Sequence, residues 1–498
     1  MQFRPSLSGP TRTMSLLSPR AVLLASAVLV LPLAAPALAD GKLAIKVGRI
    51  ITLSGPDITN GAILIENGRI TAIGADLKLP WDAIVIDQPK MVAFPGMVEA
   101  HSARGMDRPN ENIDVAPFLS VRDSIDPVGF YFEDSLRWGI TTINVQQGPN
   151  CVIGAQGMVV KPVGITIEDM LIKPDGGLKL SAAPKQGYSP ATQQQALRSA
   201  FSDLRAYLEE TVRDKQQGGD RSKREALFQG RDLEGEKSKG KAMGGNAWKV
   251  EGLEAIPRGE IDEKQEPLLA LVEGKLAAFF YCARPMDVQR ALEIARANGF
   301  LARTTLVCNT ACWKAIDAIA DAGVPVVLEG PLVNLERDPI TGKEMETFVP
   351  KVFADKKVRF ALSSSNTTTE SLWFQAATSV GLGLPRDTAL KAITIVPAEI
   401  LGLQKRVGSL EVGKDGNVLL FSGDPLSVTS FVEHVIVEGA HVYDRSKDIR
   451  VKALLEGKMP PGTSAAAEPG AKVEPSAAKP HDDTGTVPLD EPAPKKKD

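Results

Sequence analysis

Four histidines and four cysteines are the side chains of this 498-residue chain that most readily ligate a metal or act as nucleophiles. One of them, His101, follows an apolar run over 91–94, a Pro95-Gly96 break and a second apolar pair. This pattern is typical of a short buried strand that carries the histidine to its end. In barrel enzymes, side chains at the carboxyl ends of strands are placed to do chemistry. His101 is therefore the first candidate for a metal ligand. The full set comprises His101, His434, His441, His481, Cys151, Cys282, Cys308 and Cys312.

Strand-like and helix-like stretches alternate through the middle of the chain. Helical patterns, each followed or ended by a glycine, cover 130–138, 286–298 and 313–322. Strand patterns cover 141–145, 276–282, 303–308, 325–329 and 358–362. Alternation at these lengths favours parallel βα units, and their commonest closed form is a TIM-like (β/α)8 barrel of the α/β class.

Short β-type runs predict antiparallel units at both ends of the chain, over 42–87 and 408–443. The turn signals at 59–61 and 66–68, each containing Asn-Gly, predict hairpins in the first unit. The two ends of a domain often lie close together, so a domain inserted between these two β units would bring the units into contact. We therefore expect the two units to pair into one composite β-sandwich.

The N-terminus differs from the rest of the chain. Arg12 and Arg20 precede an apolar run over 21–31, and a small-residue end follows at 37–39. This is the pattern of a secretory signal peptide, so we expect an exported protein, periplasmic or secreted, that begins at Asp40. An uncleaved membrane anchor is the alternative, and the apolar run is short for a span.

Composition changes then divide the chain into five expected parts. A charged stretch at about 213–247 is poor in apolar residues, which predicts a solvated, flexible insertion. The last forty residues are rich in Pro, Ala, Glu and Lys, which predicts disorder. The expected parts are a signal peptide (1–39), a first β-sandwich part (40–94), a barrel with the insertion (95–403), a second β-sandwich part (404–450) and a disordered tail (459–498).

Charge and cysteine content limit the partners of the chain. The formal net charge is −3 and no dense basic patch is present, which argues against nucleic acid. After signal cleavage no stretch is long and apolar enough for a membrane span, so we expect no membrane contact. Export makes the four cysteines candidates for disulfides, with three full pairings open. We expect a small-molecule ligand, and a homo-oligomer stays open.

Several motifs resemble those of a known family. They are Gly-Met-Val-Glu-Ala-His-Ser at 96–102, Trp-Gly-Ile-Thr-Thr at 138–142, the Gly-rich segment 150–161, and the segments 389–394, 397–402 and 406–415. Together they resemble the amidohydrolase superfamily, specifically its imidazolonepropionase-like branch, over about residues 42–445. This resemblance implies the barrel and the composite β domain, and it says much less about activity.

The resemblance also implies where a metal site should lie. Active relatives hold one or two divalent metals through a His-x-His pair on the first strand and an acid or carboxylated lysine in mid-barrel. Here the second histidine of the pair is replaced by Ala103. The segment 177–185 resembles the mid-barrel motif, with its acid replaced by Ala182 or Ala183.

The remaining family ligands are histidines on the fifth and sixth strands and an aspartate on the eighth. By the resemblance, Tyr281 stands at the fifth-strand histidine and Cys308 at the sixth, with Asn309 as the alternative. Ser365 stands at the aspartate that moves the proton in active relatives. The expected pocket comprises His101, Ala103, Asn150, Tyr281, Arg284, Cys308, Ser365 and Asn366.

These replacements favour a degenerate metal site. A tetrahedral zinc site needs at least three protein ligands, so His101 alone cannot hold a catalytic ion. We therefore expect no cofactor; the alternatives are zinc at a thiolate-rich site that includes His101, and a Cys308–His101 nucleophile pair.

For function we expect a non-catalytic or strongly altered relative of hydrolases that act on non-peptide C–N bonds. Such a relative would bind a small ligand or a protein through the old pocket. The alternative is an active hydrolase of small cyclic or linear amides with non-standard metal ligation.

Overall fold

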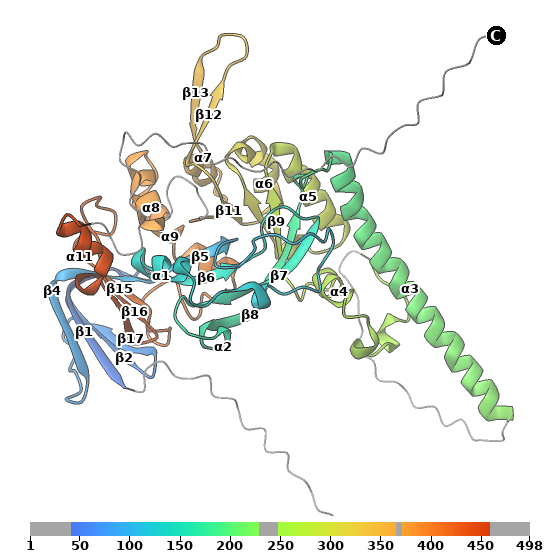
Figure 1. Ribbon diagram of the computed structural model, residues 1–498, viewed down its shortest axis with the longest axis horizontal. Coiled ribbons are helices and arrows are strands. Elements are labelled where there is room, and N and C mark those ends of the chain that lie inside the picture. Colours follow the sequence, from blue (N-terminus) through green and yellow to red (C-terminus); the bar gives the residue numbers. More distant parts are fainter. Residues whose placement is uncertain (1–40, 229–247, 365–370, 459–498) are drawn as a thin grey trace, which may run out of the picture.

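The computed structural model describes residues 41–228, 248–364 and 371–458, with side chains excluded over 219–228. An eight-stranded sheet curves at the centre of the molecule, and a seven-stranded sheet lies at one end (Figure 1). A separate two-stranded hairpin, β12 (Val333–Arg337) with β13 (Glu344–Phe348), projects from the barrel side. None of the described helices combines the length and the apolar character that crossing a membrane requires.

The eight-stranded sheet confirms the predicted TIM-like barrel, with one departure. β7 runs antiparallel to both β6 and β8, while the other paired neighbours run parallel. The barrel is nearly closed: the two end strands of the sheet are not paired in the described residues, but Ser363 Oγ, just after β14, donates to the carbonyl of His101 in β5 at 3.2 Å. In spatial order the strands are β14 (Phe360–Leu362), β11 (Val326–Leu328), β10 (Thr304–Cys308), β9 (Ala278–Cys282), β8 (Leu171–Ser181), β7 (Ile153–Val160), β6 (Ile140–Val145) and β5 (Met97–Ser102).

An apolar layer fills the interior of the barrel. Six strands each contribute at least one buried side chain, as expected when interior residues alternate with exterior ones. Leu401, Leu403 and Val407, which follow helix α10 (Ile395–Ile400), pack against this layer. The strand residues of the layer are Val98, Ala100, Val159, Phe279, Val307, Val327 and Ala361.

Helices follow the barrel strands as the sequence predicts. α5 begins with Pro285, and α6 ends at Gly323, whose φ of 66° is the left-handed conformation that glycine adopts most easily. The long helix α3 extends to Phe228 and so enters the predicted charged insertion; residues 229–247 of that insertion lie outside the described part. The helices are α1 (Phe130–Arg137), α2 (Ile167–Met170), α3 (Pro190–Phe228), α4 (Glu266–Val272), α5 (Pro285–Ala297), α6 (Ile316–Ala322), α7 (Val349–Asp355), α8 (Leu372–Gly381), α9 (Arg386–Lys391), α10 (Ile395–Ile400) and α11 (Ile449–Leu455).

Both ends of the described chain join in the seven-stranded sheet. β15 pairs antiparallel with β4, and buried residues from both ends, such as Ile45 and Leu420, share one apolar cluster. The composite β domain is therefore formed by one continuous sheet. Its strands in spatial order are β17 (Ala440–Asp444), β16 (Val432–Val437), β15 (Val418–Phe421), β4 (Ile84–Pro95), β1 (Lys42–Ile50), β2 (Ile58–Glu66) and β3 (Arg69–Gly74).

One predicted turn is wrong. Asn67-Gly68 forms the β2–β3 hairpin, with φ of 50° and 76°, but the signal at 59–61 lies inside β2. Thr59 and Gly61 continue to pair with Arg49 and Val47 of β1. Asn60 adopts a positive φ of 49°, a conformation that asparagine accepts more readily than most residues. Here this conformation occurs at an irregular position within the strand, and no turn forms.

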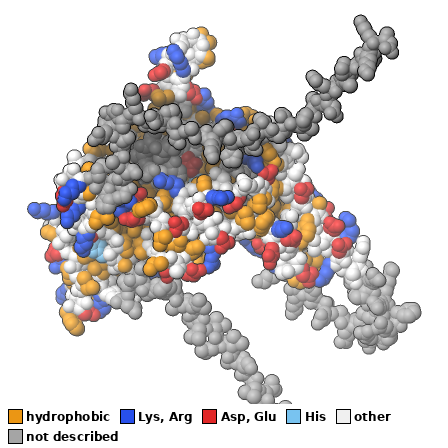
Figure 2. Space-filling view, in the orientation of Figure 1, with side chains coloured by type: hydrophobic (Ala, Val, Ile, Leu, Met, Phe, Trp, Pro, Cys, Tyr) orange, Lys and Arg blue, Asp and Glu red, His pale blue; other side chains and the backbone are white. Residues whose placement is uncertain are grey.

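Basic and acidic side chains are interspersed on the face of the molecule drawn in Figure 2. The first 40 residues, which contain the predicted signal peptide, and the predicted tail from 459 lie outside the described residues.

Candidate functional site

His101 lies at the carboxyl end of β5, as the sequence predicts, and only 1% of it is exposed. The ring stacks near Phe279 of β9, with the ring centroids 6.2 Å apart. An irregularity in the β5–β6 register between Glu99 and Ser102 accompanies this placement. The histidine is therefore held in the barrel wall by neighbouring strands.

Lys179 of β8 contacts one ring nitrogen of this histidine. Its Nζ lies 2.7 Å from His101 Nε2, and the lysine is completely buried. It also lies over the ring of Tyr281, 5.5 Å from the centroid, at a distance typical of a cation–π contact. Burial lowers the pKa of Lys179, and the Glu329 carboxylate opposes this shift.

Glu329, the residue after β11, contacts the other ring nitrogen. Its Oε1 lies 2.6 Å from His101 Nδ1, and 17% of its side chain is exposed. Burial opposes ionisation of Glu329, but its contact with His101 lowers the pKa of the carboxyl overall. Burial, followed by the charge of Lys179, lowers the pKa of His101, which favours a neutral ring.

His101 Nδ1 lies at ion-pair distance from the Glu329 carboxylate, but the two groups are not aligned for a hydrogen bond. The lowered pKa of His101 favours a neutral imidazole, which lies between the Lys179 amino group and the Glu329 carboxylate. We call His101, Lys179 and Glu329 the barrel triad.

The other replaced ligand positions divide between two environments. Tyr281 packs with the barrel interior, and burial raises the pKa of its phenol to about 12. Cys308 instead belongs to the large core cluster, in which it contacts Cys282 and Cys312. Cys312 Sγ donates to the carbonyl of Cys282 at 3.1 Å.

All four cysteines are buried and free in the structure, so none of the expected disulfides is present. Burial raises the pKa of Cys151 to about 11 and also raises that of Cys282. At Cys308 and Cys312 the largest cause is a hydrogen bond to a neighbouring thiol, which likewise raises the pKa. These thiols are therefore protonated at neutral pH, unlike the thiolates that bind metals or attack substrates.

Three further pocket residues have structural contacts of their own. Ala103 follows β5 and is half-buried. Asn150 Oδ1 accepts from the backbone N–H of Gln186 at 2.7 Å, which ties two loops together. Arg284 precedes α5, and its backbone N–H donates to Asp287 Oδ2 at 3.0 Å, so this residue caps the helix. The remaining two, Ser365 and Asn366, lie outside the described residues.

The barrel residues do not fit a catalytic zinc. In the described part of the barrel, no three His, Cys, Asp or Glu side chains have ligand atoms within 4.8 Å of one another. The Lys179 ammonium also lies where a metal would meet Nε2 of His101, at 2.7 Å from that atom. At 4 Å and an effective dielectric constant near 20, two unit charges interact by about 4 kcal/mol, so a divalent ion beside this ammonium meets a repulsion of roughly twice that size.

Sequence reasoning missed both partners of His101. Lys179 lies in β8, within the segment 177–185 that resembles the mid-barrel motif of the family, and Glu329 stands at a strand end, where barrel enzymes place functional groups. The strand-end rule could have found Glu329. Nothing in the spacing indicates that Lys179 contacts His101, because the two residues meet only through the register of strands that are far apart in sequence.

Comparison with known proteins adds a family match and a fold match. A family model described as "Amidohydrolase family" matches residues 366–443. A solved structure described as an amidohydrolase from Thermotoga maritima MSB8 is 24% identical, with a TM-score of 0.63. The similarity covers 81% of this chain and 100% of that one, and it shows a shared fold.

A curated relative matches over a much shorter segment. "Amidohydrolase tasK" of Hapsidospora irregularis is 33% identical over 70 residues. That segment is 14% of this chain and only 7% of that protein. This chain therefore matches only a small part of the length of this relative.

Proposed function

We propose that this chain is an exported member of the amidohydrolase superfamily whose barrel no longer performs metal-dependent hydrolysis of C–N bonds; the family-model match over residues 366–443 supports the membership. The observation that carries this proposal is the contact between Lys179 Nζ and His101 Nε2 at 2.7 Å. The amino group of a buried lysine thus takes the position at which the family resemblance places a metal.

The electrostatics of the barrel triad support this replacement. A buried carboxylate needs a compensating charge, and Lys179 supplies one for Glu329 through the intervening imidazole. A divalent ion at the same place would need Lys179 to leave or to lose its proton. At two of the family's functional positions, Tyr281 stays protonated and Ser365 replaces the aspartate that moves the proton in active relatives.

Export is the second part of the proposal. It rests on the two arginines, the apolar run over 21–31 and the small-residue end at 37–39. Mass spectrometry of the chain expressed with its own leader should give a mature N-terminus at Asp40 in the periplasmic or secreted fraction. A full-length chain retained in the cells would contradict export without affecting the proposal for the barrel.

The loss of hydrolysis is tested with wild type and His101→Ala, purified without a histidine tag. Each protein is assayed on a panel of N-acyl amino acids, dipeptides and lactams, with and without added Zn²⁺. We expect no turnover above buffer for either protein. Turnover by wild type that His101→Ala abolishes, together with loss of one bound metal, would overturn the proposal and favour the hydrolase with non-standard ligation.

His101→Asn serves as the second variant, because it keeps a polar side chain opposite Lys179 and Glu329. If His101→Ala does not fold, the same comparison is made with His101→Asn. Circular dichroism of each variant establishes that any loss of activity is not a loss of structure.

A further inference from the structure

The hairpin of β16 and β17 carries two of the four histidines at the edge of the seven-stranded sheet. In the register His434 pairs with Asp444, whereas Ile436 pairs with His441. Between these pairs β17 contains one extra residue, so the ladder shifts by one position. In a regular strand His441 and Asp444, three positions apart, would point to opposite faces. The β-bulge instead brings both to the face of His434.

The ligand atoms of the three residues converge. His434 Nδ1 lies 3.1 Å from His441 Nε2 and 3.8 Å from Asp444 Oδ1, and all three atoms lie within 4.8 Å of one another. Two nitrogen ligands at 2.0–2.1 Å from a tetrahedral zinc are about 3.3 Å apart. The distances from His434 Nδ1 to His441 Nε2 (3.1 Å) and to Asp444 Oδ1 (3.8 Å) therefore lie on either side of this ligand–ligand spacing of about 3.3 Å.

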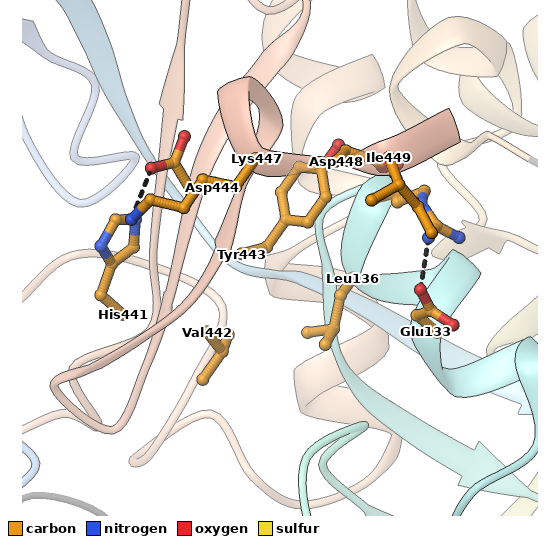
Figure 3. A pocket seen from close by; sticks show the side chains of 10 residues that line it. Glu133, Leu136, His441, Val442, Tyr443, Asp444, Lys447, Asp448 and Ile449 are labelled. Atoms are coloured by element: carbon orange, nitrogen blue, oxygen red, sulfur yellow. Dashed lines mark hydrogen bonds and ion pairs between the residues drawn. The ribbon is translucent and has the colours of Figure 1, made fainter. Parts of the chain in front are cut away.

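The surroundings orient the carboxylate and leave an approach from solvent. Ser446 Oγ donates to Asp444 Oδ1 at 2.6 Å, which fixes the carboxylate as outer hydrogen bonds do at metal sites. Figure 3 shows His441, Asp444 and Lys447 gathered at one side of a pocket of about 360 Å³. The side chain of Lys447, 79% exposed, lies 3.2 Å from Asp444 Oδ2 and can move into solvent.

We propose that His434, His441 and Asp444 form a binding site for a divalent transition-metal cation, with water completing its coordination. The donor set of two imidazoles and one carboxylate suits zinc and its neighbours in the first row. The three residues lie on two adjacent strands, so a bound ion would link β16 to β17 across the bulge. This site is separate from the barrel triad and does not depend on the proposed function.

The test uses Zn²⁺ as the probe and the full chain purified without a histidine tag. Isothermal titration in metal-free buffer at pH 7.5 should give one Zn²⁺ per chain for wild type. His441→Gln and Asp444→Asn should each weaken binding by at least ~10-fold, since loss of even an outer partner of a metal ligand costs about 10–100-fold. His441 is exposed, so His441→Gln should fold normally.

Two matched variants separate this site from other sources of binding. His101→Ala should leave the zinc affinity unchanged, because the barrel histidine is not part of the hairpin. Lys447→Ala should tighten binding, because it removes a cation beside Asp444. The proposal is overturned if wild type binds no Zn²⁺, if His441→Gln binds as wild type does, or if His101→Ala removes the bound ion.

Discussion

The barrel and the terminal hairpin each hold histidine beside a carboxylate, yet they treat cations in opposite ways. In the barrel triad, Lys179 already faces His101 at 2.7 Å, and Glu329 lies on the other nitrogen. In the hairpin, the ring nitrogens of His434 and His441 lie 3.1 Å apart, next to an ionised carboxylate. In the barrel a buried lysine contacts the imidazole directly, whereas in the hairpin the nearby lysine, Lys447, is exposed and contacts only the carboxylate of Asp444.

This difference shows that ancestry and donor geometry can point to different places. The family pattern directs attention to the carboxyl ends of the barrel strands, where only one histidine remains. The described ligand atoms converge instead at a β-bulge in the composite sheet. A metal site is defined by lone pairs that converge, and position within the fold is a weaker guide.

The largest expected effect comes from removing the cation of the barrel triad. Lys179→Met keeps much of the aliphatic volume but leaves Glu329 without its compensating charge. Removing one partner of a buried ion pair typically costs about 3–5 kcal/mol, and we expect a loss of that size in the free energy of unfolding from urea titration.

Lys173→Met is the matched control on the same strand. Its side chain is 37% exposed, lies 4.0 Å from Asp175 and donates to the Leu401 carbonyl at 3.3 Å, so its loss should cost about 1 kcal/mol, well below the loss expected for Lys179→Met. If Lys179→Met is as stable as this control, Lys179 does not compensate Glu329 and the contrast between the two regions fails.

A second prediction concerns Glu99, the other buried acid near His101 on β5. Its Oε2 accepts from the Ser364 backbone N–H at 2.6 Å, and burial raises the pKa of the carboxyl to about 7. Glu99 therefore ionises at a lower pH in the unfolded chain than in the folded one, and the free energy of unfolding falls as the pH rises from about 4.5 to 7. The full cost above pH 7 is about 3 kcal/mol, at 1.36 kcal/mol per pKa unit.

Glu99→Gln removes this titration. The stability difference between Glu99→Gln and wild type should therefore shift by about 3 kcal/mol in favour of the variant between pH 4 and pH 8. Urea titrations at both pH values measure it. An unchanged difference would mean that the carboxyl ionises normally and that the barrel wall tolerates a second negative charge.

A smaller effect is expected from the thiols. All four cysteines are buried, and their thiol pKa values are raised. Ellman's reagent should label fewer than one thiol per native chain within minutes and four after denaturation. Rapid labelling of a native thiol would show that a thiolate is accessible, and it would support the alternative hypothesis of a thiolate-rich metal site in the barrel.

The sequence predicts the architecture well and the chemistry of the site only in part. The alternating segments and the motif ending at His101 identify the barrel, because periodicity and turn residues act locally. The identities of Lys179 and Glu329 as partners of His101 depend on register between distant strands. The hairpin site depends on the extra residue in β17, since His441 and Asp444 have a spacing that a regular strand would separate.

The predicted turn at 59–61 also fails because of pairing between strands. Asn60-Gly61 carries the residue types of a hairpin turn, yet pairing with β1 continues through it. Local propensity was outweighed there by the tertiary pairing of the sheet, which the sequence pattern alone does not record.

Anomalous diffraction from a crystal soaked in Zn²⁺ tests the central contrast most directly, because it locates every ordered ion. The predicted map has a peak between His434, His441 and Asp444 and none within bonding distance of His101 Nε2. A peak at His101, with Lys179 displaced from it, would contradict the account.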